Sequence, residues 1–172
     1  RENTEFKQLL LRNTGNDWTS AMLRDVVSQS LMDGLDLNTQ AYRPVQVLLN
    51  GDYLGLFHLR ERANEHFIRD NSGIPSDNID LVDNTFESLA GDHLNLYFFS
   101  RWLLDAETES DGFVEDLEGY IELDNFMDYV ISQICLDNQD WPHNNVRLWK
   151  ERAPEGKWRW LPYDLDATFD PL

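Results

Sequence analysis

The dipeptide Asn50-Gly51 is the feature that most constrains how this chain can fold. It lies between two runs rich in β-branched, aromatic and aliphatic residues, 45–49 and 53–59. Asparagine and glycine both tolerate the positive φ angles that a two-residue hairpin turn requires. The two runs are therefore expected to pair as a β-hairpin, and the chain to contain an antiparallel sheet.

Helical periodicity accounts for most of the remaining sequence. The first helix is expected to be capped by Asp17 or Thr19 and to end at Gly34. Further helices are expected at about 63–70, 92–107, 113–120 and 124–136, and short strands at 6–12 and 79–82. The side chains predicted to face inward are Leu94, Tyr97, Phe98, Trp102 and Leu103 in the longest helix, and Phe126, Val130, Ile134 and Cys135 in the last.

Composition and charge narrow the class of protein. The chain has 172 residues, with 41% hydrophobic and 12% aromatic residues, which fits a single folded domain. Its 32 acidic and 14 basic residues give a net charge of −18, which repels nucleic-acid phosphates and argues against a nucleic-acid partner. The single cysteine, Cys135, lies in an apolar run and is predicted to be buried. No signal peptide or membrane span is visible, although the chain does not begin with Met and an export signal upstream stays open.

The C-terminal part of the chain contains a second expected hairpin, within residues 146–163. Two β-like segments flank a turn at 153–156. If Arg152 pairs with Lys157, Asn145 lies opposite Asp164, and directly opposed residues are about 4.5–5.5 Å apart at Cα. An amide and a carboxylate side by side are hard oxygen donors suited to Mg²⁺ or Mn²⁺, with phosphate oxygens completing the shell.

Asp140 precedes Asn145 by five residues, in the loop that leads into this hairpin. The same spacing occurs in the protein-kinase catalytic loop, where the aspartate accepts the proton of the substrate hydroxyl and the asparagine binds metal. The three residues therefore suggest a divalent-metal phosphoryl-transfer site. A capped, polar hairpin mouth without catalytic function is the alternative, because an aspartate and an asparagine at this spacing are common.

Nearly the whole chain resembles the CotH (spore coat protein H) kinase-like family. The resemblance rests on four blocks. These are Phe6-Lys7-Gln8-Leu9-Leu10-Leu11-Arg12-Asn13 followed by Met22-Leu23-Arg24-Asp25, then 42–57 with Arg60-Glu61-Arg62, and the active-site blocks 137–145 and 160–169.

The resemblance implies an atypical protein-kinase fold of α+β class, in which a small antiparallel sheet joins a mainly helical lobe carrying the catalytic-loop hairpin. It implies transfer of phosphate from ATP to serine of a protein substrate, with Mg²⁺ or Mn²⁺ as cofactor. Asp140 would be the catalytic aspartate, and Asn145 and Asp164 the metal ligands. Nucleotide-proximal or supporting roles would fall to Arg60, Glu61, Arg62, Arg24, Asp25, Asn144 and Asp166. The helix around Asp25 would lie behind the site, where kinases use a helical acid to hold a lysine.

The chain also departs from the kinase pattern. It shows no glycine-rich loop and no strand lysine ahead of the first block, so it reads as one incomplete domain over 1–172. About 1–62 would form the strands and helix of the first lobe, and 63–172 the helical lobe. On this basis the fragment is expected to lack full activity. The family favours a bacterial secreted, cell-surface or spore-coat location, with a cytoplasmic one still open.

Two function classes fit the sequence: an ATP-dependent protein kinase, and a non-catalytic surface or adhesion module that keeps the fold and an acidic cation site. The acidic stretch Asp77, Asp80, Asp83, Glu87 and Asp92 fits a solvated face, with a cation site as the alternative. Tryptophans 141, 149, 158 and 160 fit core packing around the hairpin better than a sugar platform.

Overall fold

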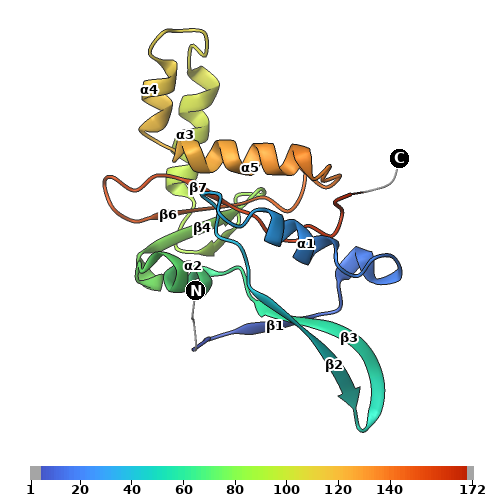
Figure 1. The fold of residues 1–172 in the computed structure, drawn as a ribbon. Helices are drawn as coiled ribbons and strands as arrows, with labels where there is room; N and C mark the ends of the chain where they lie inside the picture. Colours follow the sequence, from blue (N-terminus) through green and yellow to red (C-terminus); the bar gives the residue numbers. More distant parts are fainter. Residues whose placement is uncertain (1–4, 170–172) are drawn as a thin grey trace.

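The structure is a computed structural model that describes residues 5–169. It combines helices with two small antiparallel sheets, which confirms the expected α+β class (Figure 1). The first sheet has the strand order β1-β3-β2. Asn50 and Gly51, at φ angles of 54° and 96°, form the predicted turn between its two long strands. The strands are β1 (Leu9–Arg12), β2 (Tyr42–Leu49) and β3 (Asp52–Glu61).

The second sheet lies in the part of the chain that was expected to be mainly helical. Its strand order is β5-β4-β6-β7, so the predicted strand near residue 79 pairs with the first strand of the C-terminal hairpin. A strand of three residues is too short to show an alternating pattern, and β5 was not predicted. The strands are β4 (Ile79–Asp83), β5 (Ser88–Ala90), β6 (Arg147–Glu151) and β7 (Arg159–Leu161).

Helices precede, connect and cover the two sheets. They are α1 (Arg24–Leu31), α2 (Glu65–Ser72), α3 (Leu94–Asp105), α4 (Phe113–Glu118) and α5 (Leu123–Cys135). A short 3₁₀ turn, Gly15–Thr19, stands where the first helix was expected to begin. The carboxylate of Asp17 nevertheless accepts a hydrogen bond from the backbone N–H of Arg24 at 2.9 Å. Asp17 therefore satisfies one of the unpaired N–H groups at the start of α1, although it lies seven residues earlier in the chain.

The second sheet is buried on both faces. On one face, Leu81 and Trp149 pack with Ile68 of α2. On the other, Val82 packs with Phe99 of α3 and with the rest of a second cluster, which includes the buried Trp158. The alternation of neighbouring residues between the two clusters follows the two-residue period of a strand. Both tryptophans are thus core residues, as the packing interpretation predicted.

The predicted inward faces of two helices were wrong in part, because Trp102 and Phe126 do pack against the second core cluster but other predicted residues do not. In α3, Leu96 and Phe99 are buried, whereas Leu94, Tyr97 and Phe98 are 50–63% exposed. In α5, Ile134 and Cys135 are exposed, so the prediction of a buried thiol was also wrong.

A polar residue fixes the orientation of α5. Asn125, which is fully buried, accepts a hydrogen bond from the backbone N–H of Trp160 at 2.6 Å and donates one to the carbonyl oxygen of Asp36 at 2.6 Å. These bonds turn Asn125 and Tyr129 inward, which leaves the opposite, apolar side of the helix in solvent. A buried polar group must keep its partners, and hydrophobic periodicity alone does not detect this requirement.

The predicted register of the C-terminal hairpin was shifted by one residue. Leu161 pairs with Arg147, where the predicted register would have paired Pro162 with it. Trp158 explains the shift, because it forms a parallel bridge with Ile121 and donates its N–H to the carbonyl oxygen of Tyr120, and is therefore not available to β6.

Candidate functional site

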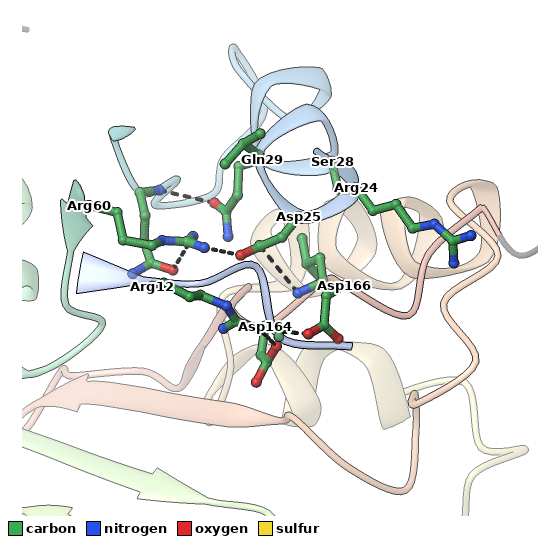
Figure 2. Close-up of polar contacts among 12 residues, drawn as sticks. Arg12, Arg24, Asp25, Ser28, Gln29, Arg60, Asp164 and Asp166 are labelled. Carbon is green, nitrogen blue, oxygen red and sulfur yellow. Dashed lines mark hydrogen bonds and ion pairs between the residues drawn. The ribbon is translucent and has the colours of Figure 1, made fainter. Parts of the chain in front are cut away.

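Arg12, at the end of β1, lies against two carboxylates from the opposite end of the chain (Figure 2). Its Nη2 donates to Asp164 Oδ1 and to Asp166 Oδ2, the latter at 2.7 Å. The Asp166 side chain is 3% exposed and that of Arg12 16% exposed. Burial lowers the pKa of Arg12, but the two carboxylates outweigh this effect and raise it. The arginine therefore stays charged and bridges both acids.

The turn after β1 approaches Asp166 from the other side. The backbone N–H of Asn16 donates to Asp166 Oδ2 at 2.8 Å. Gly15 has φ +62°, and a Cβ at this position would lie 2.0 Å from the same oxygen, so only glycine fits. Burial raises the pKa of Asp166, while the Asn16 N–H and Arg12 act in the opposite direction.

A second, buried ion pair lies behind these acids. Arg60 Nη1 donates to Asp25 Oδ2, and Asp25 Oδ1 accepts the backbone N–H of Leu165 at 3.2 Å (Figure 2). Burial, with repulsion from Arg12 as a smaller cause, lowers the pKa of Arg60 to about 10. Asp25 thus holds an arginine of β3, and it also fixes the main chain between Asp164 and Asp166.

Helix α1 is tied to the segment that carries the two acids. Gln29 Nε2 donates to the carbonyl oxygen of Pro162 at 3.3 Å, and the Ser28 and Thr168 hydroxyl groups are 2.8 Å apart. The three residues of α1 that make these contacts, Asp25, Ser28 and Gln29, are all buried. α1 therefore forms the rear wall of the site.

Asn145 joins the other two predicted residues. Its Nδ2 donates to Asp140 Oδ2 at 2.9 Å and to the carbonyl oxygen of Asp164 at 3.2 Å. The predicted trio is therefore brought together, but by the amide of Asn145 and not by direct pairing in the hairpin. Asn145 and Asp164 also share the left-handed backbone conformation, with φ of 57° and 54°. Such conformations cost energy and cluster at functional sites.

In the part of the chain that the structure describes, the side chains of the four remaining predicted residues have no recorded contact with this group, although the backbone N–H of Asn144 donates to the carbonyl oxygen of Asp140 at 2.9 Å. Arg24 points away from the acids in Figure 2 and contacts Asp17 and Ser20. Glu61 is buried and accepts the backbone N–H of Ala41. Arg62 and Asn144 are exposed, and Arg62 Nη1 donates to Gln8.

Sequence reasoning missed Arg12 as a site residue. The arginine was visible as the last residue of an expected strand, but its partners lie more than 150 positions away and nothing local indicates them. The sequence was expected to lack the strand lysine of kinases. Arg12, a cation at the end of a strand of the first sheet, contacts Asp164 instead.

The donors at the site fit a divalent cation that is shared with phosphate. Between residues 5 and 169, no group of three or more His, Cys, Asp or Glu side chains is arranged to hold a metal ion by itself. Asp164 and Asn145 nevertheless supply a carboxylate and an amide oxygen, and Mg²⁺ is commonly held by one or two carboxylates together with substrate phosphates.

The acidic stretch near β4 makes contacts within the fold. Asp80 accepts from Arg152 Nε at 2.5 Å and from the backbone N–H of Asp92 at 3.0 Å. Asp83 accepts from Thr85 and Glu87, and these bonds lower its pKa against the effect of burial.

The α+β fold is compatible with a partial kinase-like fold. Its buried helical acid, Asp25, holds Arg60, and the carboxylates of Asp164 and Asp166 lie beside this pair. The family model of CotH kinase proteins matches residues 1–171, and the chain belongs to this family. No curated protein matches the chain significantly. No helix within residues 5–169 is long and apolar enough to cross a membrane.

Proposed function

We propose that the chain carries the centre of a phosphotransferase that uses ATP and Mg²⁺ or Mn²⁺ to phosphorylate serine on a protein. The observation that carries the proposal is the Arg12 bridge between Asp164 and Asp166, with Asn145 and Asp140 beside it. Phosphoryl transfer depends on positioning and on neutralising charge, so it needs cationic and anionic groups held rigidly together.

Each residue has a role in this proposal. Asp164 and Asn145 would hold the metal, which supplies charge neutralisation on the phosphates. Asp140 accepts the proton of the serine hydroxyl, and Asn145, bonded to its Oδ2, fixes its orientation. Arg12 contacts the phosphates, as the strand lysine does in protein kinases. The expectation of inactivity rested on the lack of a glycine-rich loop and of a strand lysine, and Arg12 weakens the second of these grounds.

The non-catalytic alternative is favoured by the same bridge. Arg12 pairs with Asp164 and thereby neutralises the proposed metal ligand. If this pair is a permanent structural contact, metal and nucleotide do not enter, and the chain serves as an interaction module. The serine acceptor and a spore-coat or cell-surface location follow from the family and belong to the proposal.

The experiment is the transfer of labelled phosphate from ATP to a library of serine-containing peptides, with Mn²⁺ present. Asp140→Asn keeps an oxygen that can accept from Asn145 but removes the base, so it should retain nucleotide binding and lose turnover. Asp52→Asn makes the same charge change on the exposed hairpin and should leave turnover unchanged. Equal rates for Asp140→Asn and the parent chain would contradict the proposal.

A further inference from the structure

A polar pocket of about 260 Å³ lies between the two sheets, apart from the carboxylate group. Its lining includes Gln8 just ahead of β1, Ala63 just ahead of α2, Glu65 at the start of α2, Leu81 of β4 and Arg147 of β6. Gln8 is four residues from Arg12, a separation that an extended strand covers in about 13 Å. Arg147 follows Asn145 by two residues. The pocket is therefore linked to the proposed phosphotransfer site through β1 and through the two residues that precede β6.

Two arginines line this pocket, Arg62 and Arg147, and Arg62 is exposed and donates to Gln8. Arg147 is the one that lies between β6 and the segment ahead of α2. Its Nη1 donates to the carbonyl oxygen of Ala63 at 2.7 Å, and its guanidinium carbon lies 3.8 Å from the ring centre of Tyr163, the residue before Asp164. Its Nε is buried and has no hydrogen-bond partner. A buried donor without a partner carries a desolvation cost that a bound acceptor would relieve.

We infer that this pocket takes the base of the nucleotide whose phosphates reach Arg12, and that Arg147 sets its base selectivity, so that guanine is accepted at least as well as adenine. The inference rests on the proposed function and adds the place of the base to it. Arginine pairs with O6 and N7 of guanine, both of which are acceptors. Adenine has an amino group at the position of O6, and a donor facing a guanidinium gains nothing.

Two further features of the pocket act in the same direction. The carbonyl oxygen of Ala63 already accepts from Arg147, so only one of its two lone pairs is left for an adenine amino group. Glu65, with its carboxylate 3.3 Å from His66 Nε2, offers an acceptor for the N1 and N2 donors of guanine. A cation and a carboxylate in one pocket match the two kinds of edge group on guanine, whereas adenine lacks the second donor set.

The competing explanation is that Arg147 is only a strut between β6 and the segment leading into α2. Binding constants of Mn²⁺–ATP and Mn²⁺–GTP, measured by calorimetry, separate the two. The parent chain should bind GTP at least as tightly as ATP. Arg147→Leu removes the donors and should shift the ratio at least tenfold toward ATP, whereas Arg101→Leu, on the exposed face of α3, should leave it unchanged.

A milder variant covers the case in which Arg147→Leu does not fold. Glu65→Gln keeps the shape of the side chain and should weaken GTP severalfold while ATP binding stays as it was. ATP binding more than tenfold tighter than GTP in the parent chain, or ratios that neither variant changes, would overturn the inference alone. Failure of the parent chain to bind either nucleotide would overturn the proposed function and the inference together.

Discussion

Arg12 and Asp164 form an ion pair although 152 positions separate them in the chain. The pair joins the first sheet to the segment that follows the C-terminal hairpin, and Asp166 completes the bridge. One site is therefore built from β1, α1 and the end of the chain. A substitution at Arg12 should alter the position of Asp164 and Asp166, and a substitution at either acid should alter that of Arg12.

Replacing Arg12 tests whether the bridge serves phosphate transfer. Arg12→Ala removes the cation and should lower the rate of transfer from ATP by a factor on the order of 10²–10³, the usual cost of losing one charge-stabilising donor. Arg12→Lys keeps the charge and should recover part of the rate. Arg43→Ala removes an exposed arginine from β2, the far strand of the same sheet, and serves as the control. A parent-like rate for Arg12→Ala would exclude a role in catalysis.

The buried pair between Asp25 and Arg60 should behave as a unit. Their side chains are 7% and 2% exposed, and removal of one partner leaves the other charge buried, which typically costs about 3–5 kcal/mol. Asp25→Leu and Arg60→Met should each lower the free energy of unfolding by this amount, and the double variant by much less than the sum. Urea denaturation of the four proteins measures the coupling, and additive losses would show that the two charges do not compensate one another.

Gly15 should be the least replaceable of the turn glycines near the site. A left-handed residue with a side chain costs about 1–2 kcal/mol wherever it occurs. At Gly34, with φ +93°, nothing lies within 4 Å of a new Cβ, so Gly34→Ala should show that cost alone. At Gly15 the Cβ would also displace Asp166 and Arg12. Chemical denaturation should therefore show a clearly larger loss for Gly15→Ala, and equal losses would mean that the turn can move away from Asp166.

His58 should make the protein less stable as the pH falls. It is 2% exposed with Nε2 unpartnered, and burial, together with Arg12, lowers its pKa below the ordinary 6.5, while Asp17 acts weakly in the opposite direction. The native state thus favours neutral imidazole, and the stability this residue provides is complete above about pH 6.5 and lost as the pH falls below it.

The urea midpoint of unfolding should be compared at about pH 7.5 and pH 5.5, on either side of the ordinary histidine pKa of about 6.5. The parent chain should lose more stability on acidification than His58→Gln does. His93→Gln, at an exposed position, should lose as much as the parent. An identical loss in His58→Gln and the parent would mean that the buried imidazole does not titrate with unfolding.

Local signals predicted the hairpin at Asn50-Gly51 and the existence of most helices, because turn chemistry and periodicity are written within a few residues. The predictions of the inward face of α5 and of the register of the second hairpin were wrong for the same reason. Asn125 and Trp158 make their hydrogen bonds with distant segments, at 160 and 120, and these bonds overrule the local pattern.

The acids of the candidate site could be predicted from the sequence, whereas Arg12 could not. Asp140, Asn145 and Asp164 were found from their spacing, and they do meet. Arg12 could not be found in this way, since an arginine at the end of a strand is ordinary until the partner carboxylates are placed in space. Asp166 was named only as a supporting residue, and its burial beside Arg12 and Asn16 gives it a larger structural part.

Thermal stabilisation by Mn²⁺–ATP, compared between the parent chain and Asp164→Asn, tests most directly whether Asp164 belongs to a metal-dependent nucleotide site. A ligand at a hundred times its Kd stabilises a protein by roughly 2.7 kcal/mol, so the parent and the exposed control Asp52→Asn should both melt at higher temperature when Mn²⁺–ATP is present. Asp164→Asn should show no such shift. A shift of equal size in Asp164→Asn, or none in the parent chain, would contradict a metal-dependent nucleotide site at Asp164.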